Sequence, residues 1–394
     1  MSIAPEALAE VRRQQTRTRT RLGVAEPIGK GNPLARAREN AAAREQQAQL
    51  IDGQLRSQFG RYPEATERLR WARTREILER AAPGVDEDGV YLEMLARQAA
   101  SIEMVLRSEH SDTPNPVGAA LCDSVVLATL PALLPDASSR RFGDSSLVFV
   151  SAGLMDWVYQ ATKVSVLSWQ QLTGKEHYVS FRNTSEAVDT MLDADPRPAA
   201  LLADVLESYL FSGIARPQVS VMPQASLQAP LAVLTNFNER FIVAHEYGHA
   251  MHDANDIVLP GRADGAEEYA ADAFAFDLVI RSGFEIDDVA PNVAAQGAWF
   301  VLTALDVLRE ALDMARLGAI GPDTGFAQHP PVQARHARLR ERYLETVSDE
   351  DGDLWIDAAV APSRALRQVW ERVLKSGRPS GWQGRAVFAG WDGV

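Results

Sequence analysis

Two histidines four positions apart, His245 and His249, constrain the fold of this 394-residue chain more than any other feature. Residues with this spacing stack on one face of an α-helix, so both imidazoles can point at a single metal ion. Glu246 follows the first histidine and can reach a water at that metal rather than the metal itself. Apolar positions before the motif suit a helix with one buried side, which Asn236 or Asn238 could cap. The motif therefore predicts a metal-binding helix with Glu246 as general base.

A second acidic segment supplies a candidate third ligand. A catalytic zinc ion usually has three protein ligands and an open position for water, and two histidines with one glutamate are an established set. Glu268 is the candidate, and Asp272 falls on the same helical face, where it could accept the free ring N–H of a ligand histidine. Glu267 is the alternative ligand, but it lacks an acidic partner four residues later. His252 could also face the metal; we expect a solvated or supporting role, because Asn255 stands where the metzincin pattern requires histidine.

The linked motifs resemble a known superfamily of zinc peptidases. His-Glu-x-x-His followed by Glu-x-x-Ala-Asp is similar to the gluzincins, and most similar to their branch with HtpX, Oma and the CAAX prenyl endopeptidases. Pro135-Asp136-Ala137 with segment 146–155, the run 244–249, and segment 329–335 resemble that branch in order and spacing. The branch favours Asn where this chain has Asp136. The resemblance covers residues 120–345 and implies a zincin-type core that binds Zn²⁺.

The same resemblance implies roles for two downstream residues. His329 would be the donor that stabilises the oxyanion formed when water attacks a peptide carbonyl. Arg335 would orient ligands or carboxylates near the metal. The alternative for His329 and the two prolines after it is a loop that introduces the next helix, with proline in its first turn.

A short apolar run is expected to form a strand close to the site. Leu147, Val148, Phe149 and Val150 lie between turn-forming residues, which suits a buried or an edge strand. An extended peptide substrate can be held by pairing its backbone with a strand edge. The run is therefore a candidate substrate-binding strand, and an ordinary core strand is the equal alternative.

Composition and charge limit the classes of partner. The single cysteine, Cys122, excludes an intramolecular disulfide, and we expect it in a buried helix within the apolar stretch 117–135. No secretory signal and no run of about twenty apolar residues is visible, which predicts a cytoplasmic protein without a membrane span. Residues 1–60 carry a net charge of +4 and the remainder −17. The basic arm could bind an acidic partner, whereas the acidic body argues against binding to nucleic acid.

The predicted fold class is α+β and mostly α-helical, with a gluzincin-type core, a small β-sheet and helical additions at both ends. Four ranges are predicted. Residues 1–60 form a basic arm that is partly disordered or helical, and residues 61–116 form a helical N-terminal region. The metallopeptidase core covers 117–345 with an insertion at about 156–236, and residues 346–394 hold a C-terminal helix from about 362 and a tail rich in Trp and Gly. Within the arm, 16–30 is expected to be loosely tethered. Prolines between 213 and 235 predict an irregular loop that could gate the cleft.

These patterns together predict a zinc-dependent endopeptidase in which Glu246 acts as general base. A restricted set of intracellular protein or peptide substrates would suit the basic arm and the gating loop. The alternative is a catalytically weak or inactive peptidase-like protein with a regulatory or interaction role.

Overall fold

The computed structural model describes residues 4–21, 64–81, 88–108, 115–132, 135–173, 179–215, 217, 221, 223–254, 265–321, 329–346, 352–385 and 387–388. The chain forms two compact units. The first unit comprises Met1–Met155 and Glu239–Ala294, and the second comprises Asp156–Asn238 and Ala295–Val394. The predicted core, 117–345, thus contributes to both units, and the predicted insertion falls in the second.

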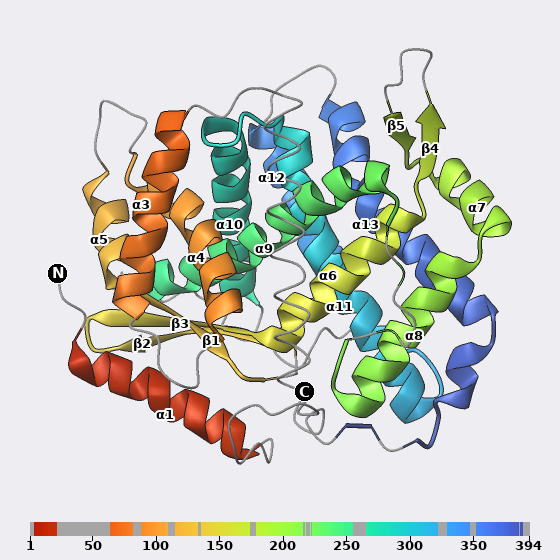
Figure 1. Ribbon diagram of the computed structural model, residues 1–394, viewed down its shortest axis with the longest axis horizontal. Helices are drawn as coiled ribbons and strands as arrows, with labels where there is room; N and C mark the ends of the chain where they lie inside the picture. Colours follow the sequence, from red (N-terminus) through yellow and green to blue (C-terminus); the bar gives the residue numbers. More distant parts are fainter. Residues whose placement is uncertain are drawn as a thin grey trace. The chain divides into compact units, whose positions relative to one another are not determined.

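A three-stranded sheet lies at the centre of the first unit (Figure 1). Its strands are β1 (Val125–Leu130), β2 (Ala137–Phe142) and β3 (Ser145–Ser151), in the order β1-β3-β2. β3 runs parallel to β1 and antiparallel to β2, to which it is joined by a tight turn with Gly143 at a φ of 60°. Before β1, α5 (Pro116–Ser124) contains Cys122, which is buried in a helix as expected, and β-branched residues then favour strand β1.

The central position of β3 corrects the predicted substrate-binding strand. Leu147 pairs with Val126 on one side and with Arg140 on the other, and Val148, Phe149 and Val150 are likewise paired on both sides. A strand with both edges occupied cannot accept an added peptide strand. The prediction of a peptide-binding edge at these four residues is wrong, and they form the core strand that was the alternative. Among the described residues β1 and β2 each pair only with β3, so both are edge strands; β1 is buried along its length, whereas β2 is partly exposed.

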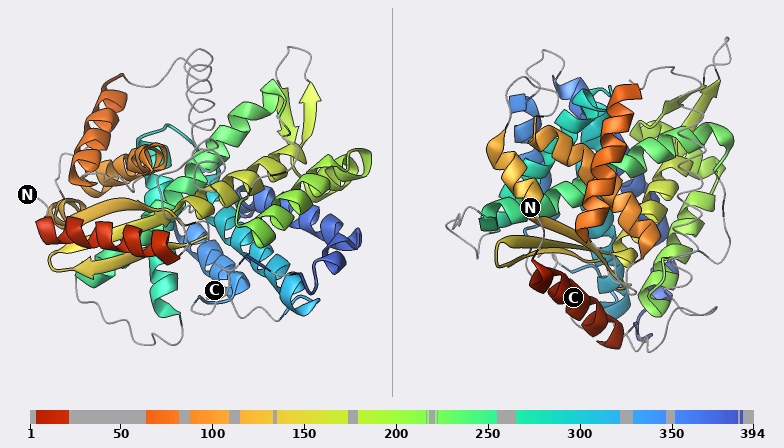
Figure 2. Two further views of the ribbon diagram at one scale, coloured as in Figure 1. Left: turned by 60° about the horizontal axis from the view of Figure 1, so that its bottom comes forward. Right: turned by 60° about the vertical axis from the view of Figure 1, so that its left-hand side comes forward.

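Helix α1 (Pro5–Arg21) covers one face of this sheet (Figures 1 and 2). Its apolar face packs into a core cluster with strands β1 and β3. The buried members of this cluster are Ala7, Val11, Val126, Ala128, Leu130, Ala132, Leu147 and Phe149. Gln15, which is 1% exposed, donates from Nε2 to the carbonyl oxygen of Thr129 at 2.9 Å. The expectation of a loosely tethered segment from residue 16 is wrong as far as Arg21, because α1 extends to that point. The rest of the predicted arm lies outside the described residues.

Helices also pack against β1, namely α3 (Glu64–Ala81) and α4 (Gly89–Leu106). Asp88 caps α4 by accepting hydrogen bonds from the N–H groups of Val90 and Tyr91, and Asn115 caps α5 by accepting one from Gly118. α3 and α4 contact each other, and both lie in the region 61–116 that was predicted to be helical. α10 (Ala266–Glu285) packs against α4.

The predicted metal-binding helix is α9 (Ala225–Ala254), which begins earlier than expected. The expected irregular loop was wrong over residues 225–235, and Asn236 and Asn238 lie inside the helix instead of capping it. The prediction was wrong here because Pro230 does not end the helix. It lies in the second turn of α9, where it removes only one intrahelical hydrogen-bond donor. Helices α7 (Ser185–Ala194) and α8 (Arg197–Ser212) precede the range in which the loop was expected.

Where the structure describes it, the second unit is helical apart from one hairpin, β4 (Gln170–Thr173) with β5 (Val179–Arg182). It contains most of α6 (Ala152–Leu167) and α11 (Pro291–Leu317), then α12 (Val332–Thr346), α13 (Gly352–Lys375) and the 3-10 turn Arg378–Gly381. The helix expected from about Pro362 begins ten residues earlier, with Pro362 inside it. Trp382 of the predicted tail is 1% exposed and stacks on Trp370 with ring centroids 6.4 Å apart. This part of the tail is therefore docked.

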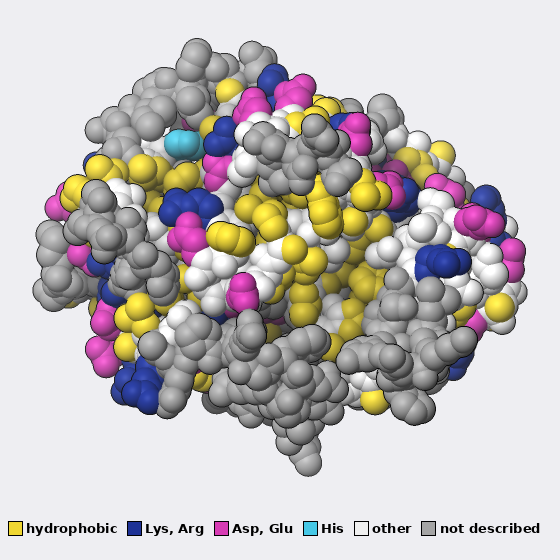
Figure 3. Space-filling model, turned by 90° about the horizontal axis from the view of Figure 1, so that it is seen from above, with side chains coloured by type: hydrophobic (Ala, Val, Ile, Leu, Met, Phe, Trp, Pro, Cys, Tyr) yellow, Lys and Arg dark blue, Asp and Glu magenta, His cyan; other side chains and the backbone are white. Residues whose placement is uncertain are grey.

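The observed mixture of many helices with a small sheet confirms the predicted α+β, mostly helical class. None of the helices in the described ranges is both long enough and apolar enough to cross a membrane. On the face shown in Figure 3, the described acidic and basic side chains are interspersed.

Candidate metal centre

A close contact between α9 and α10 builds the site within the first unit. Gly248 lies in the motif of α9, and a Cβ at this position would lie 2.9 Å from the Cα of Ala271 in α10. Only glycine permits so close an approach of the two backbones. On α10, Glu268 lies about one turn before Ala271 and Asp272 directly follows it. The close contact at Ala271 therefore brings both carboxylates to the histidines of α9.

His245, His249 and Glu268 converge on one point. Their ligand atoms lie within 4.8 Å of one another. The two histidine Nε2 atoms are 3.1 Å apart, and Glu268 places Oε2 3.5 Å from Nε2 of His245 and Oε1 3.3 Å from Nε2 of His249. Ligand atoms about 2.0–2.1 Å from a tetrahedral zinc ion are themselves about 3.3 Å apart. The three predicted ligands therefore form a group of the right size to hold a metal ion; Glu267 and His252 are not part of it.

Asp272 lies behind His245, on the side of the ring away from the other ligands. Its Oδ1 is 3.1 Å from Nδ1 of His245, and the residue is 1% exposed. A carboxylate at this position holds the Nδ1–H tautomer, which leaves the Nε2 lone pair for a metal. This is the geometry that the sequence spacing predicted for Asp272.

The carboxylates make the site favourable for positive charge. Burial lowers the pKa of His245, but the hydrogen bonds and negative charges of Asp272 and Glu268 outweigh burial and raise it to about 10. Burial raises the pKa of Glu246, and the charges of Glu268 and Asp136 add to this, although the two histidines oppose it. A divalent cation would take the place of the proton that His245 otherwise holds.

Glu246 has the environment expected of a base beside a metal-held water. It is 4% exposed, and its Oε2 is buried without a hydrogen-bond donor among the described residues. A buried carboxylate oxygen without a donor is costly unless a water or another ligand group satisfies it. The donor set and this oxygen therefore fit a metal ion with a water between the ion and Glu246.

Tyr247 anchors the opposite side of the motif, and the sequence interpretation missed this role. Its hydroxyl donates to Oε1 of Glu103 in α4 at 2.9 Å, and both residues are 0% exposed. Arg80 also donates to Glu103, and Arg107 lies 3.8 Å from its second carboxylate oxygen. The available signal was the tyrosine itself, because a buried tyrosine hydroxyl needs a hydrogen-bond partner.

Strand β2 contacts the last turn of α9 at one of its ends. At its start, Asp136 is close enough to Glu246 to raise the pKa of that carboxyl group. At its end, Nη1 of Arg141 donates to the carbonyl oxygen of Asp253 at 2.7 Å. Of the two edge strands, β2 is thus the one with a hydrogen bond to α9, whereas the sequence interpretation had placed the edge at the next strand.

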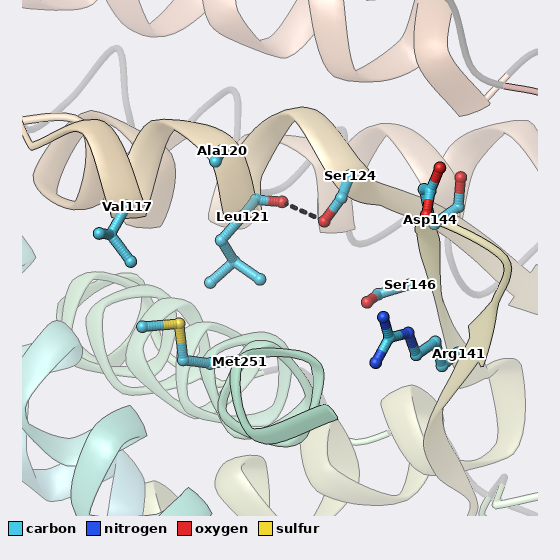
Figure 4. A pocket seen from close by; sticks show the side chains of 9 residues that line it. Val117, Ala120, Leu121, Ser124, Arg141, Asp144, Ser146 and Met251 are labelled. Atoms are coloured by element: carbon cyan, nitrogen blue, oxygen red, sulfur yellow. Dashed lines mark hydrogen bonds between the residues drawn. The ribbon is translucent and has the colours of Figure 1, made fainter. Parts of the chain in front are cut away.

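A cavity of about 270 Å³ lies at the far end of β2 (Figure 4). Val117, Leu121 and Met251 form its apolar side, between α5 and the last turn of α9. Its polar side comprises Ser124, Ser145 and Ser146 with Arg141 and Asp144. None of the predicted site residues lines this cavity.

His329 and Arg335 belong to the second unit, so their predicted roles at the metal stay predictions. His329 is exposed in a bend, and Arg335 is 6% exposed in α12. The carbonyl oxygen of Pro331 accepts hydrogen bonds from the N–H groups of Ala334 and Arg335. The prolines thus introduce α12, as the loop alternative expected.

The gluzincin resemblance rests on short motifs, of which two, in α9 and α10, meet at this site. No protein-family model, no curated protein and no solved structure matches the chain.

Proposed function

We propose that this protein is a zinc-dependent endopeptidase of the gluzincin type, resembling the branch with HtpX, Oma and the CAAX prenyl endopeptidases. The observation that carries the proposal is the convergence of two imidazoles and one carboxylate at tetrahedral spacing. A set with two imidazole ligands favours zinc over calcium or magnesium, which take mostly oxygen ligands. The buried Oε2 of Glu246 beside this set supports a hydrolytic role rather than a purely structural metal.

The chemistry divides between the metal and the side chains. When bound, zinc would supply the Lewis acidity that activates a water and polarises the peptide carbonyl. Glu246 would accept a proton from the attacking water and pass it to the leaving amine. Its raised pKa favours holding that proton between the two transfers. Asp272 would keep His245 in the tautomer that binds metal, and His329 is proposed by resemblance alone to stabilise the oxyanion.

The proposed substrates are peptides or proteins that bind in extended form. Among the described residues β2 is an edge strand, and an extended peptide can pair with such an edge. Pairing there would present a peptide carbonyl to the metal. We propose a restricted set of substrates rather than general proteolysis.

Metal removal and replacement test the proposal. We expect the purified full-length protein to contain zinc and to cleave a proteome-derived peptide library, measured as new peptide termini by mass spectrometry. Chelation should abolish cleavage, and stoichiometric Zn²⁺ should restore it where Mg²⁺ does not. His249→Ala should lose both zinc and cleavage. A zinc-loaded wild-type protein that cleaves nothing would favour the non-catalytic regulatory alternative.

A further inference from the structure

A buried hydrogen bond fixes the back of the metal-binding turn of α9 to α4. Each residue of an α-helix turns the chain by about 100°, so Tyr247 points about 160° away from both His245 and His249. Its hydroxyl donates to Oε1 of Glu103 in α4 at 2.9 Å, and both side chains are completely buried. The bond therefore holds the one turn of α9 that carries both imidazoles.

The carboxylate of Glu103 is itself held by charged neighbours. Arg80 of α3 donates to the same oxygen that accepts from Tyr247, and Nη2 of Arg107 lies 3.8 Å from the other oxygen. Arg107, at the end of α4, is paired in turn with Asp123 of α5, with Nη2 and Oδ1 2.5 Å apart. An acceptor whose position is locked by its own partners can define the position of the tyrosine ring.

A second polar link holds α9 to α4 two turns earlier. Arg240 precedes Tyr247 by seven residues, so both side chains leave the same face of the helix. Arg240 is 0% exposed, and its Nε donates to Oε1 of Gln98 in α4 at 3.2 Å. Its Nη1 donates to Oδ2 of Asp287, just beyond the end of α10, at 2.6 Å. α9 is thus hydrogen-bonded to α4 at two points on one face, which fixes its rotation about its own axis.

The rotation of α9 decides whether its imidazoles meet the carboxylates of α10. A side-chain atom about 6 Å from a helix axis moves by about 1 Å when the helix rotates by about 10°. Metal ligands need to be held to within about 0.5 Å of the productive geometry. Apolar packing has no preferred direction, whereas a hydrogen bond has a preferred length and angle. The contact at Gly248 sets the distance between α9 and α10, and the bond of Tyr247 sets the angle of α9.

We infer that Glu103 is a positioning residue of the metal centre, which acts through Tyr247 to fix the rotation of α9 that points its two imidazoles at Glu268. This inference rests on the metal centre of the proposed function. It gives α4, which supplies no ligand to the group, a part in metal binding.

Removal of one hydroxyl from the full-length protein tests the inference. Tyr247→Phe keeps the ring in the core and removes its bond to Glu103. Tyr209→Phe is the matched control, because Tyr209 is also completely buried but belongs to the second unit. Zinc affinity is measured by chelator competition, ligand geometry by the electronic spectrum of the Co²⁺-substituted protein, and stability by urea unfolding.

The two tyrosine variants should differ in metal binding. We expect Tyr247→Phe to weaken zinc binding about tenfold and to shift the Co²⁺ bands, since ligands held in a poorer geometry bind less tightly. Tyr209→Phe should bind zinc like wild type. Both variants lose a buried hydroxyl, so a loss of stability alone does not distinguish them, whereas the affinity and the spectrum do.

Glu103→Gln tests the same link from the other side. Glutamine keeps the size of the side chain but loses the charge that pairs with Arg80, so the acceptor is held less firmly. We expect zinc binding to weaken in this variant too. The double variant Tyr247→Phe/Glu103→Gln should lose less affinity than the product of the two single losses, because both act through one bond.

The outcomes separate this inference from the peptidase proposal. Wild-type zinc affinity and an unchanged Co²⁺ spectrum in Tyr247→Phe would overturn the positioning role, whatever happens to stability. Losses that multiply in the double variant would overturn it as well; if Glu103→Gln does not fold, the two tyrosine variants decide alone. A wild-type protein that binds zinc but cleaves nothing would overturn the peptidase proposal and leave this inference standing, because no readout here is cleavage.

Discussion

The pKa of His245 links metal binding to pH at the scale of single residues. In the metal-free protein, burial lowers this pKa, but Asp272 and Glu268 raise it to about 10, so at neutral pH the imidazole holds a proton that zinc must displace. Raising the pH removes the competing proton and strengthens binding. We expect the apparent zinc affinity to increase at least about tenfold per unit between pH 6 and 8, measured by competition with a chelating dye. An affinity independent of pH over this range would contradict the assigned environment of His245.

The two adjacent glutamates of α10 provide a matched pair for the third ligand. Glu268 carries both carboxylate contacts to the histidines, whereas Glu267 lies outside the group. Glu268→Gln should therefore weaken zinc binding by at least about tenfold to a hundredfold, an effect at least as large as that of losing a supporting carboxylate. Glu267→Gln should bind zinc like wild type, in the same chelator competition. Equal losses in both variants would show that the effect is a general change in charge.

At the scale of elements, the packing of α9 on α10 holds the ligands together. Replacing glycine by alanine in a helix interior ordinarily stabilises it by about 1 kcal/mol. At Gly248 the new Cβ would lie 2.9 Å from backbone of α10, so we expect Gly248→Ala to destabilise the protein by about 1–3 kcal/mol and to weaken zinc binding. Gly89→Ala is the control, because a Cβ there meets nothing within 4 Å. Urea unfolding and zinc titration measure the two effects, and a stabilised Gly248→Ala variant would contradict the close contact.

Local sequence patterns predicted the helices and strands better than they predicted which strands pair with one another. The spacing of His245 and His249 predicts a helix, and that helix exists. The prediction could succeed because it depends only on residues about one helical turn apart. The strand at 147–150 also exists, yet its sequence does not show that β1 and β2 pair with it on both sides. Pairing depends on segments elsewhere in the chain, so the edge was assigned to the wrong strand. The early start of α9 was missed because Pro230 was interpreted as a helix breaker.

At the scale of the whole molecule, the residues with the central chemistry belong to one unit. His245, Glu246, His249, Glu268 and Asp272 are all in the first unit, while His329 and Arg335 are in the second. The chain passes between the units after Met155, Asn238 and Ala294, so neighbours in sequence often belong to different units. Spacing within a helix could predict the ligands, but no local pattern could predict this division or the hydrogen bond between Tyr247 and Glu103.

The central claim is that Glu246 removes a proton from water at a zinc ion that it does not itself bind. Glu246→Gln tests it most directly, because the substitution keeps the shape of the side chain and removes the base. We predict that the variant retains zinc at the wild-type level while its cleavage of the peptide library falls by about three orders of magnitude. Cleavage at the wild-type rate by a zinc-loaded Glu246→Gln protein would contradict the mechanism.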